Sequence, residues 1–582
     1  MDYKVIKSNT KLVKGQEPTT SEILENVQAN ILEHHKRKFV KCLFFQFHQN
    51  RKPTTIAYKL KKFATEDNSP IKKKSNALGF ENLKLKDNKP DLESGWISSA
   101  KYQRIFSLQL KASIKNELLK NGTYNDEFVP EVFEKLKRDL PPIVTLHLTH
   151  KGCTRIFHKK SEELIKSKYP SDEFFQIDMA SNKVMGIWDE PEPLDKEWEL
   201  NWLNHVCKSC KRREIDMMIM VADQCKNDLK SAIDLVEEFI KKENFAKKLF
   251  EEDGQKKHYD FSESLMHKPV EPFGFRDGLS EIPFWSKNGL ELRKEAVKTV
   301  LDKEMGSYLV FRKLEQNVSL YHEKIREIVE QLRLKGYKVS YDFIEAQIMG
   351  RFKDGTPLAL AGERKLENNQ LVKEIADFDS FFLEKEKNTE QKNSKIVPND
   401  GYSIDTCPFF SHVRKVNPRK KKHLIKEKEK EKENGNGSPY PGLKGSRVRI
   451  VRRGIPYKRK FKIQYPNGIR YEKVIEGLLF MSFQSNIRSQ IGTMKEEWAN
   501  KEGFEMYRTG VDPVIGRRNS KHGEEYKFFV DWRGKEVPVK VNFQGVVKLR
   551  GGAFFYTPSI KWLAHLPELV KESKKNPVLK SM

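Results

Sequence analysis

Strand-like runs alternate along this chain with amphipathic helical patterns, and that alternation limits the folds it can adopt. The run Phe39–Phe47 is apolar enough for a buried strand, and similar patterns follow at Ile143–Thr149 and Asp216–Ala222. A helix is predicted after the third run, capped by Asp228, with one apolar face between Leu229 and Ile240. Strands separated by helices favour an α+β or α/β layered fold.

A second set of the same kind occupies the later part of the chain. A strand is predicted at Ser307–Leu314, followed by a helix whose apolar stripe runs from Tyr321 to Leu332. Further strands are predicted at Ile450–Arg453, Gly477–Gln484 and Ala553–Tyr556. The two halves therefore share a strand–helix–strand rhythm, although no sequence repeat is visible.

The length of 582 residues is too great for one ordinary core, so two domains are expected. We predict a loose leader over residues 1–20, a first domain over 21–265, a second domain over 266–570 and a tail over 571–582. A flexible, charged insertion is predicted at residues 419–439, where lysine and glutamate alternate before a Gly/Asn/Ser/Pro-rich stretch.

The charge balance raises the question of polyanionic partners. The chain has 109 Lys and Arg against 82 Asp and Glu, a formal net charge of +27, and such an excess attracts nucleic acid. Acidic residues are interspersed almost everywhere, however, and no predicted helix carries a purely basic stripe. A solvated, lysine-rich surface is the favoured interpretation, and nucleic acid is disfavoured as a partner.

Cysteine usage and the N-terminus bear on the compartment. Six cysteines in a chain of this length do not make a disulfide framework. The CxxC pair Cys207–Cys210 has His205 beside it but no second ligand pair at zinc spacing, so a surface turn is favoured. Residues 1–16 are polar and lack the apolar core of a signal peptide. No run approaches the ~18 apolar residues of a spanning helix. We therefore expect a cytoplasmic protein with no membrane partner.

Chemistry-bearing residues gather in three segments. In the first, Cys407–Arg419, His412 is framed by apolar residues and followed by a basic run, which suits an imidazole ligand held in an apolar wall. A lone histidine of this kind is more often a core residue with satisfied nitrogens. In the second segment, Glu271–Ser280, Asp277 lies in a glycine-bounded turn where a carboxylate can act as a general acid–base group. Asp-Gly alone is also a common turn dipeptide.

The third segment, Arg449–Tyr457, contains two adjacent arginines. Strand alternation points Arg452 and Arg453 to opposite faces. A guanidinium fixed in a dry pocket can offset negative charge that develops on oxygen.

Taken together, these segments resemble the dye-decolorising peroxidase family. The string Cys-Pro-x-x-x-His-x-Arg-Lys-x-Asn-Pro-Arg at 407–419 matches the family's proximal motif, and Glu271–Ser280 matches its distal signature. Matching segments occur in the family's order across residues 21–566, namely Gln28–Leu32, Gly306–Val310, Met349–Phe352, Gly477–Phe480 and Phe554–Ser559. The resemblance implies an α+β fold of two ferredoxin-like domains with antiparallel sheets. Haem would bind between the sheet and the helices of the C-terminal domain.

The resemblance also implies roles for particular residues. One haem b per chain would be held through its iron by His412, with Gly274, Phe275 and Arg414 as further cofactor-binding residues. Asp277 would be the distal acid–base residue. Arg452, placed on the haem side by the match, would stabilise the developing charge, which leaves Arg453 a surface or structural residue. The sequence does not identify the group that holds the other nitrogen of His412.

The implied activity is a haem-dependent peroxidase. It would reduce hydrogen peroxide and oxidise dyes, phenols or other bulky reductants by one-electron steps through a ferryl intermediate. Two alternatives stay open: a haem-binding, iron-releasing protein of the deferrochelatase-like kind, and a basic polyanion-binding protein. A homo-oligomer is also left open. The chain departs from the family at Lys458, where glycine is usual, and in the length of the insertion between His412 and Arg452.

Overall fold

The computed structural model describes most of the predicted core of the chain. It covers residues 18–65, 96–104, 141–157, 172–177, 179, 188, 198–202, 214–258, 269–277, 282, 284–286, 291–358, 407–418, 448–464, 470–504, 509–517, 525–530 and 536–575. Residues 1–17 of the predicted leader, the predicted insertion 419–439, the Cys207–Cys210 pair and residues 576–582 of the predicted tail lie outside this set.

The first half of the chain forms a βαββαβ unit. Its strands are β1 (Phe39–Phe47), β2 (Ile143–Leu148), β3 (Met217–Asp223) and β4 (Ala246–Gln255), with helices α2 (Pro53–Thr65) and α12 (Lys226–Glu243) after β1 and β3. Neighbouring strands are antiparallel in the spatial order β4-β1-β3-β2. Helix α12 packs on β1, β3 and β4. This is the ferredoxin-like arrangement that the resemblance implies.

The second half repeats the arrangement with long connections. Its strands are β7 (Ser307–Gln316), β8 (Val451–Arg452), β9 (Ile455–Gln464), β10 (Arg470–Gln484) and β13 (Val547–Thr557). They are antiparallel in the order β13-β7-β10-β8, with β9 also pairing with β10. Helix α14 (Val318–Leu334) follows β7. The predicted α+β fold with antiparallel sheets is confirmed.

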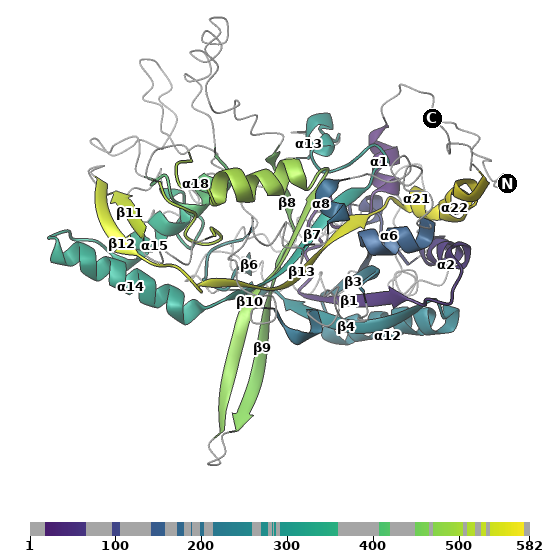
Figure 1. The fold of residues 1–582 in the computed structure, drawn as a ribbon, viewed down its shortest axis with the longest axis horizontal. Coiled ribbons are helices and arrows are strands. Elements are labelled where there is room, and N and C mark those ends of the chain that lie inside the picture. Colours follow the sequence, from purple (N-terminus) through teal and green to yellow (C-terminus); the bar gives the residue numbers. More distant parts are fainter. Residues whose placement is uncertain are drawn as a thin grey trace, which may run out of the picture.

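Shorter elements complete the two halves. They are α1 (Thr20–Asn26), α6 (His150–Phe157), α8 (Glu173–Gln176), β5 (Lys257–His258), β6 (Pro269–Val270), α13 (Lys294–Lys298), α15 (Tyr341–Met349), α18 (His412–Val416), the π-helical turns η4 (Arg488–Gly492) and η5 (Met494–Ala499), β11 (Glu525–Val530), β12 (Glu536–Val541), α21 (Ile560–Ala564) and α22 (Leu566–Lys575). Figure 1 places α2, α6 and α12 at one end of the molecule and α14, α15 and α18 at the other. The long β9–β10 hairpin projects from the body (Figure 1).

The predicted helices carry the expected faces, with one error at a helix start. In α12 the buried residues include Leu229 and Ile240, and in α14 they run from Tyr321 to Leu332. The predicted cap at Asp228 is wrong, because α12 begins at Lys226 and Asp228 lies within its first turn. An aspartate there still complements the positive end of the helix dipole. The predicted tail begins inside α22, and the boundary between the two domains stays a prediction.

The two half-sheets join edge to edge at a narrow seam, where one side chain adds hydrogen bonds to the backbone on both sides. Strands β2 and β13 share a single residue pair, Leu148 with Tyr556, yet the whole forms one nine-stranded sheet. Beside this pair the amide of Gln28 donates to the carbonyls of Leu146 (3.0 Å) and Pro558 (2.7 Å). Its oxygen accepts from the Leu146 N–H at 2.8 Å. Gln28 therefore takes the place of a strand residue at the seam.

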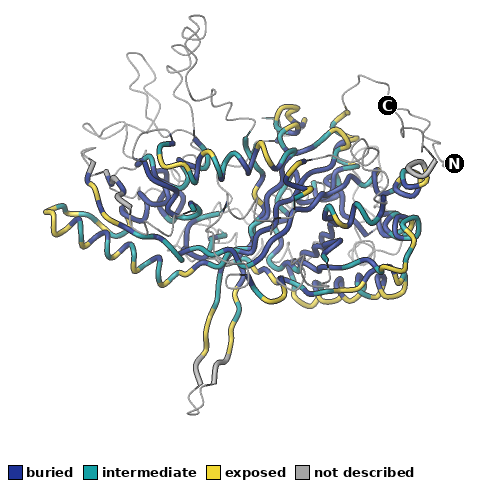
Figure 2. The backbone as a smooth tube through the Cα atoms, viewed as in Figure 1, coloured by how far each residue is buried: buried dark blue, intermediate teal, exposed yellow. Residues whose placement is uncertain are grey.

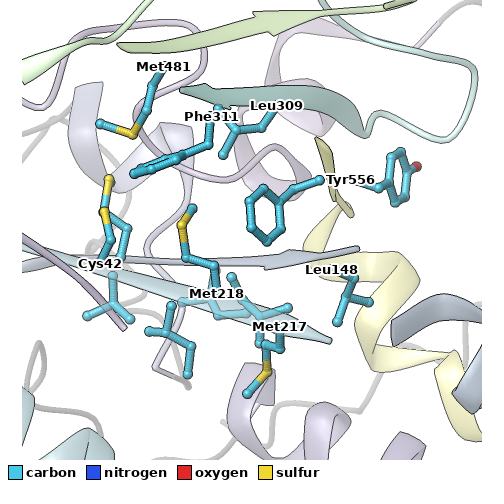
Figure 3. Close-up of a cluster of buried hydrophobic side chains, with 14 of the residues drawn as sticks. Cys42, Leu148, Met217, Met218, Leu309, Phe311, Met481 and Tyr556 are labelled. Atoms are coloured by element: carbon cyan, nitrogen blue, oxygen red, sulfur yellow. The ribbon is translucent and has the colours of Figure 1, made fainter. Parts of the chain in front are cut away.

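The sheet folds over at this seam, so that its two halves face each other. Phe44 on β1 and Phe311 on β7 contact edge to face at 5.6 Å between ring centroids. In a flat sheet their strands, four positions apart, would be separated by about 19 Å. Figure 3 shows Cys42 and Met218 of the first half facing Leu309, Phe311 and Met481 of the second. These side chains are buried, as are the central strands in Figure 2.

A buried ion cluster also links the halves. The ammonium of Lys313 on β7, fully buried, lies 2.9 Å from Glu252 on β4 and 2.6 Å from Glu199. Arg459 on β9 contacts the same two carboxylates at 2.5 and 2.8 Å. Burial raises the pKa of Glu252, although the positive charges of Lys313 and Arg459 act to lower it. Among the described residues, no helix is long and apolar enough to cross a membrane.

We expect Gln28→Leu to destabilise the protein by about 3 kcal/mol, since it removes the partner of three buried backbone groups. The shift in the midpoint of urea unfolding measures the effect. Gln176→Leu, the same change at an exposed helix end, is the matched control and should alter the midpoint little. Equal shifts for both variants would show that Gln28 does not hold the seam.

Candidate active site

All three predicted segments contribute residues to the wall of one cavity, which has a volume of about 320 Å³. His412, Asp277, Phe275 and Arg452 all contribute to its wall, although they are far apart in the sequence. Apolar side chains from β10, α15 and the η4–η5 region line much of the rest, including Leu478, Phe480, Met349, Ile491 and Trp498.

The imidazole of His412 is oriented by a buried carboxylate. Its Nδ1 lies 2.9 Å from Oδ2 of Asp512, which is 0% exposed. Oδ1 of the same carboxylate accepts from the N–H groups of Val514 (2.8 Å) and Ile515 (2.9 Å). Burial alone would raise the pKa of Asp512, but the charge and hydrogen bond of His412 and the two amide donors outweigh it and lower the pKa to about 2. With Nδ1 bound in this way, Nε2 is the nitrogen that can serve a ligand in the cavity.

Asp512 is the site residue that sequence reasoning missed. It lies 100 residues beyond His412 in the chain. Its own neighbourhood, Gly510–Pro513, carries the ordinary signals of a turn. Only the tertiary fold shows that this carboxylate meets the histidine.

Helix α18 is short, and side chains at both of its ends fix it. The hydroxyl of Ser411 donates to the carbonyl of Gln347 at 2.5 Å. The guanidinium of Arg414 donates to the carbonyl of Cys407 and lies 3.7 Å from the ring centroid of Phe409. Arg414 is fully buried and is not part of the cavity wall. Its predicted cofactor-binding role stays a prediction.

The turn that carries Asp277 is held by a second carboxylate, that of the partly buried Glu271. Glu271 accepts from the N–H groups of Phe273 (3.0 Å) and Phe275 (2.9 Å) and from the amide of Gln316 at 2.7 Å. Burial raises the pKa of Glu271 despite these donors. Gly274 has φ of 97°, a conformation that favours glycine. Gly274 thus shapes the turn, while Phe275 and Asp277 reach the cavity wall.

The two adjacent arginines point to different places, as the alternation predicts. Arg452 on β8 lines the cavity. Arg453 is 1% exposed and donates to the carbonyls of Asn30 (2.7 Å) and Ile31 (3.0 Å). Arg453 therefore ties the Asn30 loop of the first half to the second half, and Arg452 is left facing the cavity.

The stability of the haem-free protein should fall at low pH because of Asp512. Its pKa is about 2 in the folded chain and near 3.9 in an unfolded one, so its contribution is complete above about pH 4 and disappears as the pH falls towards 2. This contribution amounts to about 2.5 kcal/mol. Urea unfolding of the Asp512→Asn variant should show a flatter dependence on pH between 4 and 2. The exposed control Asp234→Asn should keep the slope of the parent. Parallel curves for Asp512→Asn and the parent would contradict the prediction.

Several known proteins are similar to this chain in sequence. No family model matches the chain. The multifunctional dye peroxidase DyP2 of Amycolatopsis sp. is 27% identical over 336 residues, covering 51% of this chain and 61% of that protein. The dye-decolorizing peroxidase msp1 of Mycetinis scorodonius is 25% identical over 321 residues, covering 52% of this chain and 55% of that protein. The chain thus matches less than two thirds of the length of either relative.

Solved structures show the same fold over nearly the whole chain. The DyP-type peroxidase of Anabaena sp. superposes with a TM-score of 0.60 at 22% identity, covering 94% of both chains. DyP2 from Amycolatopsis sp. superposes with a TM-score of 0.58 at 20% identity, covering 94% of this chain and 97% of that one. This chain is thus similar in sequence to dye-decolorising peroxidases over about half of its length, and it shares the fold of DyP-type peroxidase structures.

Proposed function

We propose that the protein is a haem-dependent peroxidase that reduces hydrogen peroxide and oxidises dyes, phenols or other bulky reductants one electron at a time. The observation that carries the proposal is the shared cavity. The carboxylate-oriented imidazole of His412, the carboxylate of Asp277 and the guanidinium of Arg452 line one cavity.

The residues of the cavity fit a haem. In the part of the chain that the structure describes, no group of three or more His, Cys, Asp or Glu side chains could hold a bare metal ion. A single imidazole such as His412 suits an iron whose other ligands come from a macrocycle. The apolar wall suits the porphyrin, and the cations Arg276, Arg449 and Arg517 on the same wall suit its two carboxylates. When bound, haem supplies the iron that takes up peroxide and the redox equivalents.

The protein's own residues would manage the proton and the charge. Asp277 would accept a proton from bound peroxide and return it to the departing oxygen. Arg452, which lines the cavity but is exposed to solvent, would donate hydrogen bonds to the oxygen on which negative charge grows. Asp512 would keep the His412 imidazole in one orientation and one tautomer throughout. Reductants too large for the cavity would give up electrons at the protein surface.

A haem titration followed by peroxide tests the proposal. The purified chain should bind one haem with a Soret band typical of a histidine-ligated ferric iron, and one equivalent of peroxide should shift that band. His412→Ala should abolish the histidine-type spectrum. Haem binding without a response to peroxide would support carriage or iron release instead. No haem binding would limit the family resemblance to the fold.

We expect Asp277→Asn to keep its haem and to react with peroxide more slowly by roughly 10²- to 10⁴-fold, because the proton transfer loses its acid–base group. Stopped-flow absorbance at the Soret band measures the rate. Glu271→Gln is the matched control, since this carboxylate lies in the same turn but its oxygens are occupied by Gln316 and backbone donors. The control should lose stability more than rate. An unchanged rate in Asp277→Asn would remove Asp277 from the mechanism.

A further inference from the structure

Three buried lysines converge on the loop that carries Asp512. Lys415 on α18 and Lys527 on β11 are 0% exposed, and Lys495 on η5 is 4% exposed. Lysine is among the residues least often found fully buried, because its ammonium loses its hydration. Three such residues around the single loop 510–516 therefore call for a local reason.

Each ammonium donates to a backbone carbonyl of that loop. The bonds run from Lys415 to Gly510, from Lys527 to Val511 and from Lys495 to Ile515, the last at 2.6 Å. Lys415 also donates to the carbonyl of Lys501 at 2.8 Å. The three lysines come from separate elements, so the loop is fixed from three directions.

The carbonyls that they hold flank the carboxylate of Asp512 on both sides. The backbone of Asp512 is itself bound twice, by donation to the carbonyl of Ala499 (2.8 Å) and by acceptance from the N–H of Gly516 (3.0 Å). An ammonium on a peptide oxygen polarises that peptide and strengthens the bond its N–H donates. Lys527 binds the oxygen of the peptide group between Val511 and Asp512, and the N–H of that group is the N–H of Asp512. In the same way, Lys495 binds the oxygen of the peptide group whose N–H belongs to Gly516.

Lys415 links this loop to the histidine itself. It lies three residues after His412, close to one helical turn, so both belong to the five-residue helix α18. The helix thus contacts the loop twice, through His412 to Asp512 and through Lys415 to Gly510. Two contacts from one short helix restrain both the distance and the direction of the imidazole relative to the carboxylate.

We infer that Lys415, Lys495 and Lys527 are positioning residues for the His412–Asp512 pair. They hold the loop carbonyls so that the carboxylate meets Nδ1 in one geometry and Nε2 keeps a fixed aim into the cavity. Their positive charges also raise the reduction potential of an iron held by His412, opposing the electron donation that Asp512 promotes. The effect on iron rests on the proposed function, whereas the positioning of the pair does not.

The first test uses the haem-free protein. The N–H proton of His412 Nδ1, observed by NMR in histidine-labelled protein and assigned with His412→Gln, reports the bond to Asp512. We expect Lys415→Met and Lys527→Met to abolish or broaden this signal at a temperature where both variants are folded. Lys527→Arg, which keeps the charge and a donor, should restore it. If Lys415→Met does not fold, Lys495→Met removes the bond to the Ile515 carbonyl and gives a second form of the same test.

The second test uses the protein loaded with haem. Lys415→Met should raise the haem dissociation constant roughly 10- to 100-fold, and the neutral variants should lower the reduction potential of the iron. Lys313→Met is the matched control: it removes a fully buried ammonium from the opposite side of the sheet, within the Glu252 cluster. It should lower the melting temperature and leave both the NMR signal and the potential unchanged.

The outcomes separate the inference from the proposed function. An unchanged His412 signal in folded Lys415→Met and Lys527→Met would overturn the inference. Equal effects on that signal in Lys313→Met would also overturn it, since general loosening would then be the cause. A lost signal in a protein that binds no haem would uphold the positioning and overturn the peroxidase proposal.

Discussion

The hydrogen bond between His412 and Asp512 is the interaction on which the site depends. An imidazole has two nitrogens and two neutral tautomers, and a carboxylate at Nδ1 selects the one with Nε2 open to the cavity. A buried carboxylate is costly unless it is well bound. Here two amide donors and the imidazole outweigh the effect of burial and lower its pKa to about 2, so it is ionised at neutral pH. The surrounding loop and helix are built to keep that arrangement.

The folded-over sheet supplies the rigid background for this pair. Alternate side chains of β7 point to opposite sides of the sheet. Phe311 and Lys313 face the first half of the molecule, whereas Arg312 and Leu314 line the cavity. On β10, Met481 faces the core between the half-sheets and Phe480 lines the cavity. Because one set of strands bounds both the core and the cavity, close packing between the half-sheets restrains the cavity wall.

Sequence periodicity and motifs predicted much of this structure, and the failures share a cause. Apolar stripes such as Tyr321–Leu332 gave the helices, because burial follows the helical period. The resemblance predicted that His412, Asp277 and Arg452 share one site, and all three residues line the same cavity. The sequence could not show Asp512 beside His412, nor Gln28 replacing a strand residue between β2 and β13, since both contacts join distant segments. The cofactor-binding role of Arg414 stays a prediction, because a motif gives order along the chain without giving the direction of each side chain.

The motif around His412 now has a physical explanation in three parts. The histidine presents Nε2, Arg414 ties the helix to the carbonyl of Cys407, and Lys415 ties it to the loop of Asp512. A helix of five residues has few hydrogen bonds of its own and is not stable alone. Its position must therefore come from side-chain bonds to neighbouring backbone. Carbonyl oxygens are suitable partners, because they bind the ammonium and guanidinium groups without adding negative charge beside the Asp512 carboxylate.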